Sequence, residues 1–160
     1  MATPMKPPSD FSYSKCVMKA GMIWDEVERA GLAGVQGVWC HEAGGARMFL
    51  EANTQVPVED LLKGMIVQSG NDATVALAEG VGGTVERFVE MMNQQAKALG
   101  MTRTSYKNPE GLTEPGHTTT ARDLAILAQR LMQDFPDRVG YYAIKKYRYP
   151  GTPAANDSNR

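Results

Sequence analysis

The sequence predicts a mainly α-helical fold with a minor β component. Two segments, 57–68 and 118–135, carry apolar side chains at intervals of three and four residues, the spacing of one helix face. Proline and threonine stand where these helices begin, and glycine stands where helices end. Strand-like alternation is short, so the sheet component is expected to be small.

Composition limits the classes of protein that fit. The 160 residues, with 42% hydrophobic residues, correspond to one domain or a piece of a larger one. The net charge of −1 argues against a nucleic-acid binder, which would carry a basic excess. No run approaches about 20 apolar residues, so no membrane-spanning helix is expected. The first eight residues carry no apolar run and predict no secretory signal.

Two cysteines, Cys16 and Cys40, are too few for a disulfide framework. One disulfide and two free thiols are equally compatible with this count. A metal site is not expected.

The first part of the chain gives weak signals. Residues 1–10 predict an irregular arm, and residues 12–29 have helical character that Gly21 interrupts. Residues 30–45 are glycine-rich and favour either a loop or a short strand. Residues 48–50 form a short apolar run.

The middle of the chain predicts two consecutive helices. Pro57 opens the first, which should end near Gln68 because Ser-Gly-Asn follows. Asp72 is expected to cap the second helix, over 73–81, and two glycines end it.

Two more helices are predicted further along. Thr84 is the expected cap of the third, and Gly100 is expected in a left-handed conformation at its end. A turn-rich segment follows, over 101–117. Thr118 or Thr119 is expected to cap the fourth helix, which ends before Pro136, and residues 141–149 predict a surface strand.

The first candidate for chemistry is Ser12-Tyr13-Ser14-Lys15, a Ser-x-x-Lys pattern. On a helix, residues three apart lie on one face, so the Lys15 amine would reach the Ser12 hydroxyl. A desolvated lysine with a lowered pKa accepts the serine proton and creates a nucleophile. A solvated surface turn is the alternative explanation of this short pattern.

The second candidate is Ser69-Gly70-Asn71, a Ser-x-Asn pattern between two predicted helices. The hydroxyl of Ser69 would pass a proton to a leaving group, and the amide of Asn71 would hold a substrate carbonyl or amide. The alternative explanation is that these residues merely end one helix and begin the next.

Longer runs carry a resemblance to a known family. Residues 45–50, 61–73, 108–112 and 115–123 closely resemble the low-molecular-mass penicillin-binding proteins, the serine D-alanyl-D-alanine carboxypeptidases of peptidase family S11. The resemblance covers about 44–160 and leaves 1–43 as an atypical N-terminal segment. It implies that 44–160 is a partial catalytic domain, mostly the helical lobe of the α/β (α+β) beta-lactamase/transpeptidase-like fold.

The resemblance also implies residue roles. Ser12 would be acylated, Lys15 would act as the base, Ser69 would relay a proton, and Asn71 would orient the substrate. The implied substrates are peptidoglycan peptides ending in D-Ala-D-Ala, with beta-lactams as further ligands and no metal or organic cofactor. The family works in the periplasm or cell envelope, although no signal peptide is visible in this chain.

Two features of the sequence depart from the family pattern. Met18 stands where the family has a polar partner of the lysine, and a Lys-Thr-Gly motif is absent from the 160 residues. An inactive, truncated helical module that binds peptidoglycan or a protein partner is therefore the alternative function, and it leaves self-association open. A thiol enzyme using Cys16 is a third alternative. The basic and aromatic strip 145–149 favours a solvated strand face over contact with an anionic polymer.

Overall fold

A computed structural model of the protein describes residues 34–36, 45–51 and 54–151. Ser12 and Lys15 lie outside the described residues, as do Cys16, Cys40 and the helix expected over 12–29. The predictions made for these positions remain predictions.

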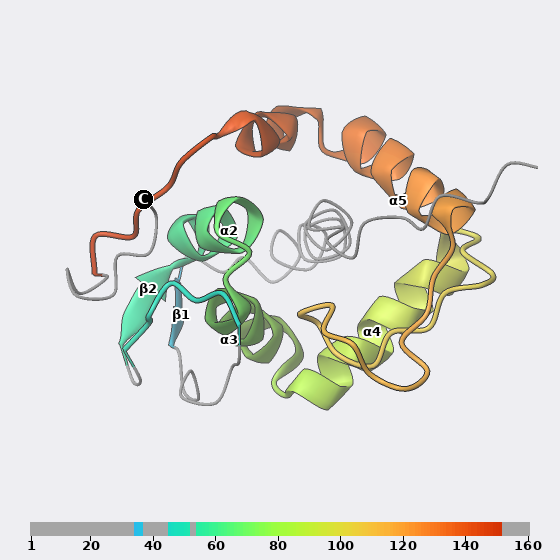
Figure 1. Cartoon of the computed structure of the whole chain (residues 1–160), viewed down its shortest axis with the longest axis horizontal. Helices are drawn as coiled ribbons and strands as arrows, with labels where there is room; N and C mark the ends of the chain where they lie inside the picture. Colours follow the sequence, from blue (N-terminus) through green and yellow to red (C-terminus); the bar gives the residue numbers. More distant parts are fainter. Residues whose placement is uncertain (1–33, 37–44, 52–53, 152–160) are drawn as a thin grey trace, which may run out of the picture.

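The described residues form a mainly helical structure with a small sheet, as predicted (Figure 1). In chain order, the elements are β1 (Gly34–Gln36), β2 (Gln55–Pro57), α2 (Val58–Val67), α3 (Asn71–Gly82), α4 (Val85–Ala98), α5 (Ala121–Asp134) and the 3₁₀ helix η1 (Pro136–Ala143). Figure 1 shows α2 and α3 beside the strand pair, α4 and α5 at the other end of the molecule, and η1 leading back toward α2.

The second strand leads directly into α2, and Ser69 lies between α2 and α3. β1 and β2 are antiparallel, with Val35 opposite Val56. Pro57 ends β2 and is also the N-cap of α2, as its fixed φ suggests. Glu59 and Asp60 lie in the first turn, where negative charge stabilises the N-terminus of a helix.

The N-cap of the second helix lies two residues before the predicted one. Gly70 is the N-cap of α3, so the prediction that Asp72 caps it was wrong. Asp72 lies inside the first turn, and most of its carboxylate bonds go to another segment instead. The alanines of α3 let it pack closely against α2, because small side chains allow two helices to approach.

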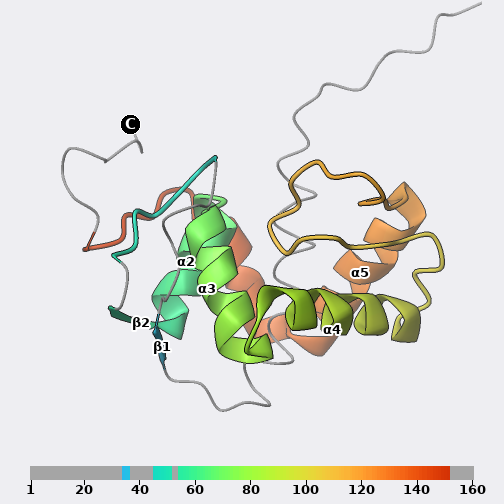
Figure 2. The ribbon, with the colours of Figure 1, turned by 90° about the horizontal axis from the view of Figure 1, so that it is seen from below.

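The third helix confirms its predicted caps. The Thr84 hydroxyl accepts the amide of Arg87 at 3.2 Å, and Gly100 has φ 79°. A Cβ on Gly82 would come within 2.9 Å of the Phe88 amide nitrogen, so glycine permits the close corner between α3 and α4. Figure 2 shows α4 crossing α3 rather than running alongside it.

The fourth predicted helix, α5, has a different cap from the one predicted. Thr120 caps it, and its Oγ1 accepts the Asp123 amide at 3.1 Å. Thr118 is unavailable because it forms a β-bridge with Ser105, in which the two residues exchange backbone hydrogen bonds of 2.8 and 3.0 Å. The predicted caps Thr118 and Thr119 were therefore wrong by one or two residues.

The strand predicted over 141–149 was also wrong. Its first residues belong to η1, and the structure assigns no strand to the remainder of this stretch. The alternation has another cause: Tyr147 and Tyr149 pack against the core, whereas Lys146 and Arg148 face solvent. The pattern of inward and outward residues thus reflects a segment covering the helices, not a pleated sheet.

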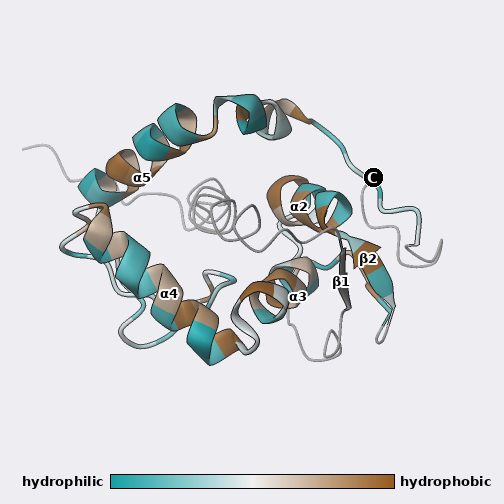
Figure 3. Cartoon of the chain, turned by 180° about the vertical axis from the view of Figure 1, so that it is seen from behind, coloured by the Kyte–Doolittle hydropathy of each residue, from teal (hydrophilic) through white to brown (hydrophobic). Residues whose placement is uncertain are grey.

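The core lies mainly where α2, α3 and the first part of α4 meet. Figure 3 shows apolar residues in α2, α3 and β2, next to polar residues along α4 and α5. The most buried large side chains come from the helices, from segment 45–51 and from the loop after α4, and include Met48, Leu61, Met65, Leu77, Phe88, Met101, Tyr106 and Leu127. This core fixes the corner between α2 and α3, where the Ser-x-Asn pattern lies.

Candidate active site

Ser69 occupies the corner between α2 and α3 in a left-handed conformation. Its φ is 56°, a region that costs a residue with a Cβ about 1–2 kcal/mol. The corner is closed by the Gly64 carbonyl, which accepts the amides of Gln68 and Gly70, each at 3.1 Å. A serine held in such a conformation by its surroundings is typical of functional sites.

Asn71 is the first residue of α3 and is only 5% exposed. Its backbone amide donates to the Ala46 carbonyl at 2.8 Å, so the segment 45–51 lies against the corner. A Cβ on Gly45 would come within 2.9 Å of the Asn71 Nδ2, and Gly45 has φ 84°. The two residues of the predicted pair, Ser69 and Asn71, are therefore both placed on one rigid corner.

Asp72 fixes the segment 45–51 and was not predicted to do so. Its buried carboxylate accepts the amides of Met48 at 2.9 Å and Leu50 at 3.1 Å. The residue between them, Phe49, has φ 60°, which turns both amides toward the same anion. An acidic residue at the start of a helix was visible in the sequence, but its partners lie more than 20 residues earlier and gave no local signal.

Gly64 is a second position that the sequence did not single out. A Cβ there would overlap Met48 Sδ, so the methionine packs directly on the backbone of α2. Glycine inside a helix is destabilising by about 1 kcal/mol relative to alanine, and its presence marks this close contact.

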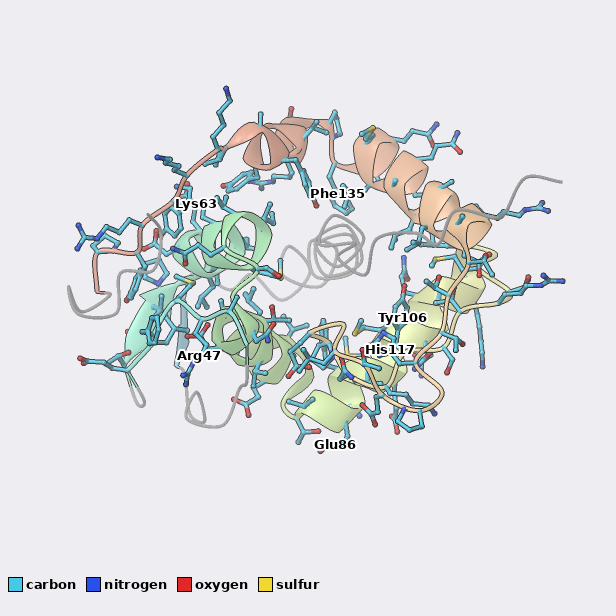
Figure 4. All side chains as sticks on the ribbon, viewed as in Figure 1. Arg47, Lys63, Glu86, Tyr106, His117 and Phe135 are labelled. Carbon is cyan, nitrogen blue, oxygen red and sulfur yellow. The ribbon has the colours of Figure 1, made fainter. Side chains whose placement is uncertain are left out.

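The same segment carries an exposed arginine, Arg47. The Arg47 guanidinium carbon is 5.3 Å from the centroid of the Phe49 ring, within the range of a cation–π contact. Figure 4 shows Arg47 beside α3. Arg47 directly follows Ala46, whose carbonyl accepts the Asn71 amide, and its side chain is exposed.

His117 lies at the end of the turn-rich segment 101–117. Its ring packs edge-on against buried Tyr106, with 5.7 Å between centroids, and its Nδ1 accepts the Lys107 amide at 3.4 Å (Figure 4). Accepting that bond requires a neutral imidazole, and burial lowers the pKa of His117. These contacts give the histidine a structural role in the loop.

Within residues 34–36, 45–51 and 54–151, no three side chains of His, Cys, Asp or Glu are placed to hold a metal ion. None of the helices in this part of the chain combines the length and apolar character needed to cross a membrane.

Comparison with known proteins gives the family. The family model described as D-alanyl-D-alanine carboxypeptidase, peptidase S11, matches residues 33–159. The chain belongs to the peptidase S11 family. The matched residues include Ser69 and Asn71, whereas Ser12 and Lys15 precede them.

Curated relatives agree with the family assignment. The chain is 43% identical over 111 residues to the D-alanyl-D-alanine carboxypeptidase DacA of Haemophilus influenzae, covering 69% of this chain and 28% of that protein. It is 50% identical over 90 residues to DacF of Bacillus subtilis, covering 56% of this chain and 23% of DacF. The chain thus spans about a quarter of the length of these relatives.

Solved structures confirm the fold. The D-alanyl-D-alanine carboxypeptidase DacD of Francisella tularensis matches with a TM-score of 0.76 and 38% identity over 81% of this chain and 32% of that one. Penicillin-binding protein 5 of Haemophilus influenzae matches with a TM-score of 0.78 and 34% identity over 86% of this chain and 43% of that one. The described helices therefore belong to the penicillin-binding protein fold, which confirms the predicted fold class.

Proposed function

We propose that the chain acts as a serine D-Ala-D-Ala carboxypeptidase, or as part of one, trimming peptidoglycan stem peptides and binding beta-lactams. The observation that supports this most is the rigid Ser69–Asn71 corner, which lies inside the family match. Residues 44–160 would form part of the catalytic domain, with 1–43 as a divergent segment. The periplasm or cell envelope is the compartment in which this substrate occurs.

In this proposal, Ser69 relays a proton and Asn71 orients the substrate. The left-handed φ of 56° fixes the Ser69 backbone, and the neighbouring helix start fixes Asn71. A side-chain amide both donates and accepts, so Asn71 suits a peptide or penicillin amide. Rigid placement matters because a misplacement of about 1 Å costs on the order of 100-fold in rate.

The nucleophile in this proposal is Ser12 with Lys15 as its base. The Lys15 amine takes the hydroxyl proton while Ser12 Oγ bonds to the carbonyl carbon of the terminal peptide bond. The carbon–nitrogen bond then breaks, and the leaving D-alanine amine receives a proton through Ser69. Water hydrolyses the resulting ester and restores the serine.

The sequence lacks the third motif that the resemblance implies. Lys-Thr-Gly does not occur in the 160 residues. The resemblance implies that the strand carrying this motif forms part of the oxyanion site. Loss of oxyanion stabilisation alone costs about 10²–10³ in rate, so we expect slow acylation of this chain on its own.

The test is covalent labelling of the purified full chain with a fluorescent penicillin. We expect a labelled adduct that Ser12→Ala abolishes, that Ser69→Ala and Asn71→Ala slow, and that Ser14→Ala leaves unchanged as the matched control. Complete absence of label would overturn the proposed function for this chain. Label that survives Ser12→Ala would overturn the choice of nucleophile alone.

A further inference from the structure

The side chain of Gln68 joins the serine corner to a segment almost 80 residues later. Its Nε2 donates to the Tyr147 carbonyl at 2.7 Å, across 79 residues of sequence. A backbone carbonyl only accepts, so this contact fixes which way the amide points. The other end, Oε1, is buried without a hydrogen-bond partner within the part of the chain that the structure describes.

The segment that receives this bond, residues 144–149, is itself held against α2. The Tyr147 hydroxyl donates to Asp60 Oδ1 at 2.9 Å. Burial and the nearby Asp60 carboxylate raise the pKa of Tyr147, so the hydroxyl keeps its proton and remains a donor at neutral pH. Figure 1 shows the chain after η1 passing beside α2.

Gln68 immediately precedes Ser69, and both its backbone and its side chain are fixed. Its amide donates to Gly64 at 3.1 Å inside α2, while its side chain binds Tyr147 outside the helix. The next residue then leaves the helix with φ 56°. An unfavourable conformation persists where surrounding contacts over-determine it, and Gln68 supplies one such contact at the position before the serine.

We propose that Gln68 is a positioning residue for Ser69, and that segment 144–149 acts on the site through it. This inference rests on the proposed function for its catalytic readout. A side chain that merely attached the segment to the surface would alter stability when changed, without altering the serine. A positioning side chain also alters the rate at which the corner supports acylation.

Gln68→Glu tests the proposal because the two side chains have the same shape. The carboxylate cannot donate to the Tyr147 carbonyl, so we expect penicillin acylation on the order of 10-fold slower than in the unsubstituted chain at pH 8. As pH falls toward 5, the introduced carboxyl gains a proton and donates again. The rate relative to the unsubstituted chain at the same pH should therefore recover.

Gln94→Glu is the matched control, since Gln94 is exposed on α4 and the charge change is identical. It should leave the acylation rate unchanged at both pH values. Tyr147→Phe is a second variant, which removes the bond to Asp60 without touching Gln68. It should slow acylation relative to the unsubstituted chain and speed exchange of the 65–72 peptide, and no change in either would overturn the role given to segment 144–149. It keeps the proposal testable if Gln68→Glu does not fold.

Hydrogen–deuterium exchange of the peptide covering 65–72 gives a readout independent of catalysis. We expect faster exchange in Gln68→Glu at pH 8 and unchanged exchange in Gln94→Glu. Unchanged labelling and exchange in Gln68→Glu would overturn the inference, as would a labelling loss that does not recover at low pH. If the unsubstituted chain takes no label, the proposed function is overturned, and exchange alone decides the inference.

Discussion

The Asp72 carboxylate accepts the backbone amide of Met48 at 2.9 Å, although 24 residues separate the two in the chain. This bond attaches the segment 45–51 to the first turn of α3, next to Asn71. The Leu50 amide donates to Oδ2 of the same carboxylate, and the Ala73 amide donates to Oδ1, which Met48 also binds. The neighbourhood of the serine corner thus depends on one buried anion.

Asp72→Asn should destabilise the fold by about 2 kcal/mol or more, because one amide donor is then left facing the new Nδ2 in a buried place. Urea unfolding followed by circular dichroism measures this loss. Asp134→Asn is the control, since Asp134 makes an exposed ion pair with Arg130 and should change stability by less than about 1 kcal/mol. Equal losses in the two variants would contradict the role given to Asp72.

Gly64→Ala should destabilise the protein, although alanine is the better helix former. The added Cβ overlaps Met48 Sδ, and overpacking of this kind costs about 1–3 kcal/mol. In a Met48→Ala background the overlap is gone, so the same change should be neutral or stabilising. A double-mutant cycle of unfolding free energies measures the difference.

The control for that cycle is Gly140→Ala in η1, where a Cβ would meet nothing within 4 Å. Its cost should be the same with Met48 or alanine at position 48. If Gly64→Ala costs as much without the methionine as with it, the close contact between the two residues is not the reason for the glycine.

Stability should fall as pH drops below about 6.5, in part through His117. Burial lowers the pKa of this imidazole in the folded protein, so the unfolded chain binds a proton more readily. The contribution of neutral His117 to stability is fully present above the pKa of the unfolded chain, about 6.5. It is lost as pH falls through the lower pKa of the folded protein. Glutamine does not take up a proton in this pH range. The thermal midpoint of His117→Gln should therefore fall less between pH 7 and 5 than that of the unsubstituted protein. Parallel profiles for the two proteins would contradict this prediction.

Local signals predicted most helices well. The helices after Pro57 and Thr84 begin where their caps indicated, and Gly100 adopts the predicted left-handed conformation. Local preference failed where a distant partner competed for a residue. Thr118 is taken by its bridge to Ser105, so the cap of α5 moves to the next suitable threonine.

The sequence predicted the residues of the candidate site that lie next to one another in the chain, but not the distant contacts that hold them. Ser69 and Asn71 were identified from a three-residue pattern and its family context, and both lie on the same corner. Their supports were missed because Asp72 and Gln68 bind segments far away in sequence, at Met48 and Tyr147. Periodicity and capping describe neighbours within a few residues and carry no record of such pairs.

Ser69→Gly and Ser69→Ala separate the hydroxyl from the backbone conformation. Both remove the hydroxyl, so both should slow penicillin acylation to a similar extent if Ser69 relays the proton. Only glycine adopts φ 56° without strain, so Ser69→Gly should be more stable than Ser69→Ala, by about 1 kcal/mol. Thermal unfolding and acylation rates of the two variants, measured side by side, test both halves. Equal stability would mean that the left-handed conformation carries no cost, and an unslowed Ser69→Gly would mean that the hydroxyl does not take part. Serine at position 69 would then be retained for its hydroxyl although glycine fits this backbone conformation with less strain, as expected where selection acts on function.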